Sequence, residues 1–175
     1  MGLVQQLGYD VEEANAFQRL MQRIASSRPG AWCFSKTLHL VDRPLFRLTK
    51  GRVTVPGIVA GLPVVMVTTT GRRTGEPRVS PLLGIPTGDD LAIIGSNFGQ
   101  SSTPGWVHNL EADPHASVRY RERQVSVIAR RAGDREADET FASAAKVYPG
   151  YARYRERAAH REIRVFVLEP AAAPG

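Results

Sequence analysis

The chain has 175 residues, of which 42% are hydrophobic and 23% charged, so its size and composition suit one globular domain and exclude a disordered or fibrous protein. Lys and Arg outnumber Asp and Glu by 23 to 17, and the net charge of +6 indicates either an anionic partner (phosphorylated cofactor, lipid or nucleic acid) or a basic solvated surface. The single cysteine, Cys33, excludes an intramolecular disulfide, and no apolar run of about 18 residues predicts a membrane span, so we expect a cytoplasmic protein.

The first predicted element is an amphipathic helix near the N-terminus. Asp10 and Glu13 have the spacing of a capping box, and the apolar residues that follow recur at helical spacing. This helix, over residues 10–28, packs either on the protein's own core or, through its arginines, on the inner face of the cell membrane. A second, shorter helix is predicted to begin after Asp42.

From residue 62 the sequence changes to β-branched runs separated by Gly and Pro, which predicts about six strands. The connections between the first three are too short for βαβ crossovers, so an antiparallel sheet, closed into a small barrel or strongly twisted, is expected. The runs are "LPVVMVTTT" (62–70), "RVSPLLGIP" (78–86), "DLAIIGS" (90–96), "HASVRYR" (115–121), "QVSVIARR" (124–131) and "IRVFVLE" (163–169).

Two helices are predicted between these strands. Pro104 can begin a short helix that "DP" at 113–114 ends, and Asp134 can cap a longer one that turns Phe141 inward. Three tyrosines then follow at steps of three, a spacing that places side chains on neighbouring parts of one helix face. They are Tyr148, Tyr151 and Tyr154.

Several common catalytic motifs are absent. The sequence contains no G-x-G-x-x-G dinucleotide motif, no P-loop and no G-x-S-x-G hydrolase elbow. The four histidines are scattered and have no cysteine pair to join them, so no metal site is expected.

The remaining candidate is an anion site in "TGRRTGEPR" (70–78). Gly71 and Gly75 can take positive φ and turn backbone N–H groups into a nest, while the arginines suit phosphate or carboxylate. Taken alone, the segment is better explained as a charged hairpin turn. A second polar loop, "GSNFGQSSTPGWVHN" (95–109), adds Ser96 and Trp106, although Trp106 suits a core position as well as a ligand-binding one.

Taken together, these segments resemble the deazaflavin-dependent nitroreductase family, whose members use coenzyme F420. The residues that carry the resemblance are "PVVMVTTTGRRTGEPRVSPLLGIPTGDDLAIIGSN" (63–97), "TPGWVHNLEADPHASV" (103–118), "VYPGYARY" (147–154) and "IRVFVLEP" (163–170). The resemblance implies an α+β, mainly β fold: a split β-barrel of about six antiparallel strands with flanking helices. We therefore expect an N-terminal helical extension over 1–42, the barrel domain over 43–170 and a tail over 171–175.

The resemblance also implies roles for individual residues. The phosphate and oligoglutamate tail of F420 would lie along Arg72, Arg73, Thr74, Gly75, Pro77 and Arg78. The deazaflavin and its ribityl chain would be held by Thr68, Ser96, Asn97, Trp106, Val107, His108, Asn109 and Tyr151. Leu83, Tyr148, Tyr151 and Tyr154 would line the substrate pocket, with Tyr151, Tyr148 and Ser96 as the catalytic candidates.

One departure from the family concerns the strand after the arginine loop. Some members have aromatic residues where this chain has Leu82, Leu83 and Gly84. We therefore expect an aliphatic, roomier pocket wall, which leaves the substrate open.

The expected function is an F420H2-dependent oxidoreductase that transfers a hydride to a quinone or a similar conjugated or nitro acceptor. One alternative keeps the barrel but binds FMN. Another, of a different class, is a non-catalytic basic module that binds F420, lipid or nucleic acid. A stacking platform for nucleic acid needs aromatic residues that alternate with basic ones along the strands. This sequence has no such alternation, so no specific nucleic acid is expected. A homodimer is expected only by analogy with other split barrels.

Overall fold

A computed structural model describes residues 1–10, 62–158 and 160–172. The helix predicted over 10–28 and the one predicted after Asp42 lie outside these residues, apart from Asp10. Among the described residues, no helix is long and apolar enough to cross a membrane.

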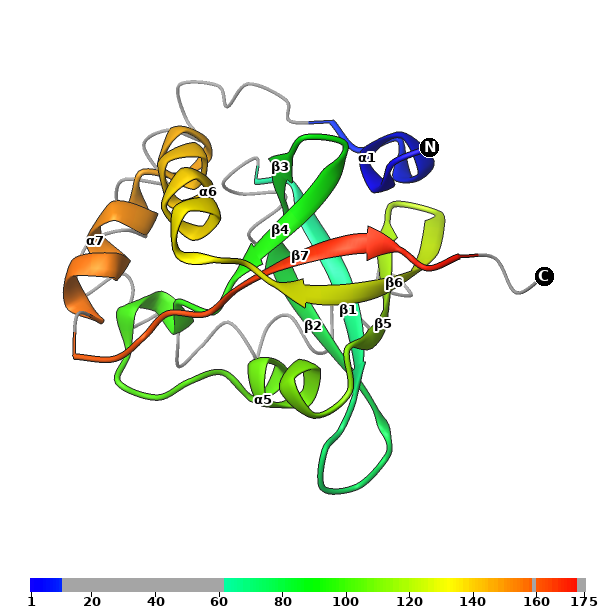
Figure 1. Cartoon of the computed structure of the whole chain (residues 1–175), viewed down its shortest axis with the longest axis horizontal. Helices are drawn as coiled ribbons and strands as arrows, with labels where there is room; N and C mark the ends of the chain where they lie inside the picture. Colours follow the sequence, from blue (N-terminus) through cyan, green and yellow to red (C-terminus); the bar gives the residue numbers. More distant parts are fainter. Residues whose placement is uncertain (11–61, 159, 173–175) are drawn as a thin grey trace.

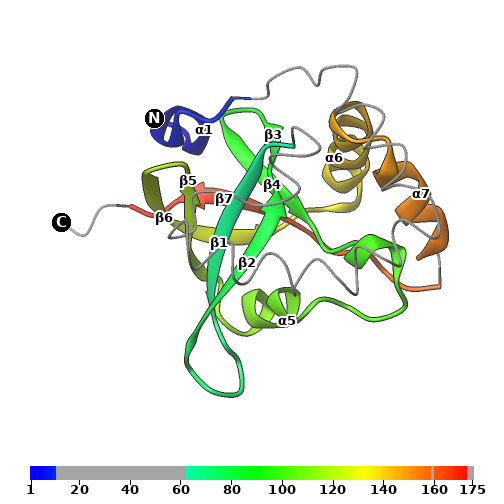
Figure 2. The same cartoon turned by 180° about the vertical axis from the view of Figure 1, so that it is seen from behind.

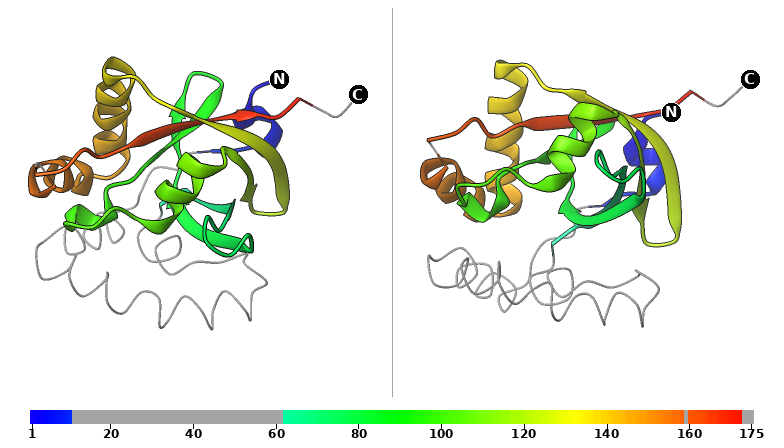
Figure 3. Two further views of the ribbon diagram at one scale, coloured as in Figure 1. Left: turned by 60° about the horizontal axis from the view of Figure 1, so that its bottom comes forward. Right: turned by 90° about the horizontal axis from the view of Figure 1, so that it is seen from below.

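One antiparallel sheet dominates the described part of the chain, with the strand order β2-β1-β5-β6-β7-β4-β3 (Figures 1 and 2). The sheet curls on itself, and the views in Figure 3 show the strands wrapping around the interior as in half of a barrel. This confirms the predicted mainly β split-barrel fold. The strands are β1 (Val64–Thr70), β2 (Pro77–Leu83), β3 (Ile85–Thr87), β4 (Asp90–Ile94), β5 (His115–Tyr120), β6 (Arg123–Arg131) and β7 (Val165–Pro170).

The second predicted strand is divided in two at Gly84. β2 ends at Leu83 and pairs with β1, whereas β3 begins at Ile85 and pairs with β4 at the opposite edge of the sheet. A side chain at position 84 would collide with the Tyr9 ring, because a Cβ there lies 2.8 Å from the Tyr9 hydroxyl oxygen. The sequence pattern predicted one strand because "LLGIP" stays apolar across the break.

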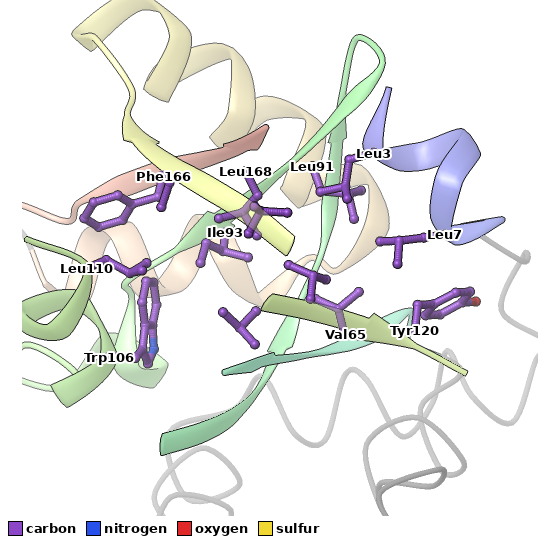
Figure 4. Close-up of a cluster of buried hydrophobic side chains, with 14 of the residues drawn as sticks. Leu3, Leu7, Val65, Leu91, Ile93, Trp106, Leu110, Tyr120, Phe166 and Leu168 are labelled. Carbon is purple, nitrogen blue, oxygen red and sulfur yellow. The ribbon is translucent and has the colours of Figure 1, made fainter. Parts of the chain in front are cut away.

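The main core lies inside the curl of the sheet (Figure 4). Val65 and Val67 point into it from β1, because alternate residues of a strand face the same side. Trp106 and Phe166 pack at one end of this core, with ring centroids 6.1 Å apart. Leu3 and Leu7 enter at the other end from a short helix, α1 (Leu3–Leu7), which the sequence pattern did not predict.

The remaining helices follow β4 and β6, and the two that follow β6 cover a second apolar cluster. The loop after β4 contains a 3-10 turn, η1 (Asn97–Gly99), and is followed by α5 (Gly105–Ala112). The connection from β6 to β7 contains α6 (Asp134–Val147) and α7 (Gly150–Arg157). The cluster joins Phe141 of α6 and the three tyrosines to β-strand residues such as Ile85 and Val165.

Both predicted helices therefore form, with one error at a terminus. The N-cap of α6 is Gly133, and no side chain caps this end. Asp134 is the first residue inside the helix, where its carboxylate still interacts favourably with the positive end of the helix dipole.

Candidate functional site

A cavity of about 320 Å³ lies where the base of the β1–β2 hairpin meets the turn after β4 and helix α7. It joins segments that are far apart in the sequence, and its lining is mostly apolar and aromatic, as in sites that hold a flat ring. The lining residues are Leu62, Val64, Ser80, Pro81, Leu82, Leu83, Ile94, Ser96, Asn97, Phe98, Pro104, Trp106, Tyr148, Tyr151 and Tyr154.

The three tyrosines form one wall of the cavity. Tyr148 directly follows α6, whereas Tyr151 and Tyr154 lie on α7, so they do not share one helix, although they share one cluster. Each pair of rings has its centroids 5.9–6.0 Å apart in tilted or edge-to-face contact. The hydroxyl oxygens of Tyr148 and Tyr154 are 3.0 Å apart, and one hydroxyl donates to the other.

Burial keeps these phenols protonated. Desolvation raises the pKa of Tyr151 and Tyr154 well above the ordinary value near 10, and also raises that of Tyr148, where the hydrogen bond with Tyr154 opposes it. When one hydroxyl of the Tyr148–Tyr154 pair donates to the other, the accepting hydroxyl still has its own hydrogen. The pair is therefore a neutral donor at the cavity wall.

A second wall, next to the tyrosines, is an unusually constrained turn. Asn97 and Phe98 have positive φ values of 47° and 56°, which non-glycine residues rarely adopt, and Gly99 follows at 76°. Ser96, just before them, is 6% exposed. Phe98 packs edge-on against Tyr154, with centroids 6.0 Å apart, so this wall supports the tyrosine wall.

Arg161 holds this turn from behind. Its guanidinium donates to the carbonyl oxygens of Ser96 at 2.8 Å, Gln100 at 3.1 Å and Gly95 at 3.2 Å. A planar fork with five N–H groups suits several carbonyls at once. Sequence reasoning missed Arg161, because a single arginine in "AAHREIR" has no local signal that connects it to a turn about 60 residues earlier.

The arginine loop forms the tip of the β1–β2 hairpin, which projects beyond α5 in Figure 1. Arg72, Arg73 and Arg78 are exposed, and Arg78 pairs with Glu76 at 3.3 Å. Among the described residues, no ion pair involves Arg72 or Arg73. Within that part of the chain, both charges are open to an anionic ligand.

The expected nest of backbone N–H groups is not found in this loop. The N–H groups of Gly71, Thr74 and Gly75 donate to carbonyls within the loop. Gly75 has the expected positive φ of 69°, whereas Gly71 does not and is needed for space, since a Cβ there would lie 2.9 Å from Thr74 Oγ1. An anion would therefore meet mainly arginine side chains here.

Asn109 attaches this loop to helix α5. Its buried side chain donates to Thr69 Oγ1 at 3.0 Å and accepts from the Arg72 backbone N–H at 3.1 Å. These bonds give Asn109 a structural role, because they hold the hairpin against the helix that contains Trp106. Its assignment to the cofactor stays a prediction.

The structure thus brings most of the predicted ring and substrate residues to one cavity. Ser96, Asn97, Trp106, Leu83 and the three tyrosines all line it. Thr68 lies on β1, on the same face as the lining residue Val64. The loop residues Arg72, Arg73, Thr74, Gly75, Pro77 and Arg78 lie beyond one end of the cavity.

Two predicted cofactor residues that follow Trp106, Val107 and His108, do not line the cavity. Val107 is fully buried in the main core, so its side chain packs there. His108 is half-buried, and its ring nitrogen lies 3.3 Å from Glu111 on the same helix. Among residues 1–10, 62–158 and 160–172, no group of three or more His, Cys, Asp or Glu side chains is placed to hold a metal ion.

The cavity and the arginine loop are connected along β2. Ser80 lines the cavity, and Arg78 lies two residues further on the same face of the strand, about 7 Å away at the usual strand rise. The arginines at the hairpin tip follow beyond it. This arrangement suits an elongated ligand that has a flat ring at one end and negative charge at the other.

Comparison with known proteins identifies the family of the chain. The sequence matches the family model described as F420H(2)-dependent quinone reductase over residues 43–170. The chain belongs to the F420H(2)-dependent quinone reductase family. The match confirms the resemblance seen in the sequence and covers nearly all of the described barrel.

The chain is also similar to individual proteins and to solved structures. The F420H(2)-dependent quinone reductases of two Mycobacterium tuberculosis strains, H37Rv and CDC 1551, are each 33% identical to the chain over 88 residues, which are 49% of this chain. The chain spans 57% of the length of these relatives. Among solved structures, an F420-H2 dependent reductase is 31% identical, with a TM-score of 0.56. The match covers 61% of this chain and 94% of the reductase chain. A structure described as a domain-swapped dimer is 29% identical, with a TM-score of 0.58. This match covers 74% of this chain and 97% of the other.

Reduced coenzyme F420 is the cofactor of this family, and the described residues fit it. The aromatic cavity suits the flat deazaflavin ring. The exposed Arg72 and Arg73, which form no ion pair within the described residues, suit the anionic tail, and their separation from the cavity along β2 suits an elongated ligand. The fit therefore rests on the placement of charge and aromatic surface at two ends of one path.

Proposed function

We propose that the protein transfers a hydride from F420H2 to a quinone or a similar conjugated or nitro acceptor. The observation that carries the proposal is the 320 Å³ cavity, which joins an aromatic wall to the path toward the arginine loop. Family membership supports the use of F420. The apolar lining, including Leu82 and Leu83, suits the uncharged ring of a quinone.

Each part of the site has a separate task in this reaction. When bound, reduced F420 supplies a hydride, and a quinone that takes up this hydride and one proton becomes a hydroquinone. The arginine loop binds the tail by charge, while Trp106 and the turn at Ser96 exclude water from the ring. The Tyr148–Tyr154 hydroxyl pair holds a proton at the wall and donates a hydrogen bond to the acceptor oxygen.

Tyr151 has a different part in the proposal. It is 7% exposed and lies between Phe141 and the other two tyrosines, with centroids 6.0–6.5 Å away. We assign it the position closest to cofactor and acceptor, where its ring orients the acceptor. Tyr151→Phe tests this assignment: a ring role predicts an unchanged rate, whereas loss of the rate would assign the hydroxyl to the chemistry.

The decisive experiment is a titration of the protein with F420 followed by fluorescence, then an assay of F420H2 oxidation with menadione. The proposal predicts saturable binding and oxidation that depends on menadione. Absence of F420 binding would overturn it, and binding without turnover would leave a carrier of F420. The same titration with FMN checks the alternative cofactor, because saturation by FMN alone would favour an FMN enzyme.

Two further features of the proposal concern assembly and location. We propose a homodimer, supported by the 29% identical structure that is a domain-swapped dimer, and light scattering of the purified protein tests it. Attachment to the membrane surface through residues 10–28 stays a prediction, since residues 11–28 lie outside the described part of the chain. Sedimentation with anionic vesicles checks it.

A further inference from the structure

The cavity has an aliphatic side that is formed by the base of the β1–β2 hairpin. Four of its lining residues, Leu62, Val64, Leu82 and Leu83, surround the point where β1 begins and β2 ends. We call these four residues the leucine wall. Its position decides how much room the cavity leaves beside the tyrosines.

Tyr9 lies next to this wall and is not among the residues that line the cavity. Its hydroxyl lies 2.6 Å from the Gly84 carbonyl oxygen and 3.0 Å from the Pro63 carbonyl oxygen, within hydrogen-bonding distance of both. Pro63 is flanked by Leu62 and Val64, and Gly84 directly follows Leu83. One phenol therefore contacts the backbone just before β1 begins and just after β2 ends.

Tyr9 is itself firmly held. It is 7% exposed, its backbone N–H donates to the Val4 carbonyl at 3.0 Å, and its ring packs on Tyr120 with centroids 4.8 Å apart. Burial, together with the neighbouring Tyr120 and Tyr151 phenols, raises the pKa of Tyr9 above its ordinary value, so the hydroxyl remains a donor.

The segment before Tyr9 is tied to the start of β4. The backbone N–H of Leu3 donates to Asp90 Oδ1 at 3.1 Å, and that of Val4 donates to the Asp89 carbonyl at 3.0 Å. Gly2 packs so closely that a Cβ there would lie 2.4 Å from Asp89. Residues 2–9 therefore form a rigid support from which the Tyr9 hydroxyl reaches the wall.

We infer that Tyr9 is a positioning residue that determines acceptor specificity, because its hydroxyl fixes the leucine wall and so sets the size of ring that the cavity accepts. This inference rests on the proposed function, in which the cavity holds the acceptor. Tyr9 touches neither cofactor nor acceptor and acts through Pro63 and Gly84. Gly84 takes part because only a residue without a Cβ lets the hydroxyl approach its carbonyl.

Tyr9→Phe is the direct test, because it removes the hydroxyl and keeps the ring. Tyr120→Phe is a matched control: its hydroxyl also donates to a backbone carbonyl, that of Asp10 at 3.3 Å, but Asp10 does not flank the leucine wall. Both variants lose one buried tyrosine hydroxyl in the same core, so similar decreases in melting temperature are expected. Gly84→Ala is a second test of the wall, independent of whether Tyr9→Phe folds.

The readout is the selectivity between two neutral quinones, duroquinone with one ring and menadione with two. KM for each is measured with F420H2, and Kd for each by equilibrium dialysis without turnover. In Tyr9→Phe and Gly84→Ala, the ratio of the menadione value to the duroquinone value is expected to shift at least about threefold, for KM and for Kd alike. The reason is that small changes of shape in an apolar pocket alter selectivity by such factors. The kcat is expected to stay nearly unchanged. Tyr120→Phe is expected to keep the ratio of the unaltered protein.

The outcomes separate the two proposals. If the unaltered protein binds both quinones but all three variants keep its ratio, or Tyr120→Phe shifts it as much as Tyr9→Phe does, the role of Tyr9 is refuted and the acceptor pocket stands. If the unaltered protein binds neither quinone by dialysis, the cavity is not an acceptor pocket and both proposals are overturned.

Discussion

Replacing Arg161 with alanine is expected to damage both stability and the cavity. The guanidinium donates to three carbonyls of the turn after β4, and the residues Gly95 and Ser96 that contribute two of them are buried. At about 1 kcal/mol net for each lost hydrogen bond, the free energy of unfolding falls by about 3 kcal/mol. For a domain of this size that corresponds to a melting temperature about 6–12 °C lower.

The functional effect follows from the backbone of the turn. The positive φ values of Asn97 and Phe98 are costly, and without Arg161 the turn relaxes to more common conformations. Because Ser96 and Asn97 line the cavity, F420 affinity is expected to fall about tenfold, equivalent to about 1.4 kcal/mol. Lysine at position 161 reaches fewer carbonyls and should give an intermediate result.

Arg131→Ala is the matched control for this experiment. It removes the same charge, but the Arg131 guanidinium is exposed and pairs with the Glu162 carboxylate at the surface, so it contributes less than about 1 kcal/mol. Thermal unfolding and F420 titration are measured for both variants. Equal melting temperatures, or an Arg161→Ala protein that binds F420 as tightly as the unaltered one, would refute the reasoning.

Three further predictions concern the arginine loop and the tyrosines. Alanine at both Arg72 and Arg73 should weaken F420 binding at least about tenfold by fluorescence but leave a tail-less deazaflavin riboside nearly unaffected, and equal losses would contradict the tail assignment. Asn109→Leu should lower the free energy of unfolding by about 2 kcal/mol, because it removes two hydrogen bonds. Hydrogen exchange at the Arg72 amide should become faster in this variant but not in His108→Leu, which would locate the loss at the hairpin. The raised pKa values of Tyr151 and Tyr154 favour the protonated phenols in the folded state. Their contribution to the free energy of unfolding is therefore intact below pH 10 and decreases above it. A urea midpoint that stays constant from about pH 9 to 11 would refute this.

Much of the barrel was predictable because its strands have a strong local pattern. β1, β4 and β7 alternate or run apolar between clear Gly and Pro boundaries, and their pairing follows from short connections. The break at Gly84 was not, since the apolar pattern continues across it and the packing of Tyr9 on Gly84 joins residues 75 positions apart in the chain. Helix α1 was missed for a related reason: "LVQQL" is too short for a helical period, and its stability comes from Leu3 and Leu7 in the core.

The candidate site was likewise predictable from the sequence only in part. The tyrosine spacing predicted a common wall, and the structure places all three at one cavity, although a break between α6 and α7 separates Tyr148 from the others. The arginine loop was found from its composition, but its backbone hydrogen bonds were not, because they depend on the turn's own geometry. Arg161 and Asn109 act through contacts 37 to 66 residues away in the sequence, which no local pattern encodes.

The position of β7 in the sheet has a consequence for how the protein is made. β3 and β4 join the rest of the described sheet only by pairing with β7, whose residues 165–170 are synthesised after all the other strands. Until this strand leaves the ribosome, β1, β2, β5 and β6 form one separate piece and β3 and β4 another, each with unpaired edges and exposed apolar faces. Folding is therefore completed only after synthesis of the last strand, and a nascent chain stopped before Val165 is expected to depend on chaperones.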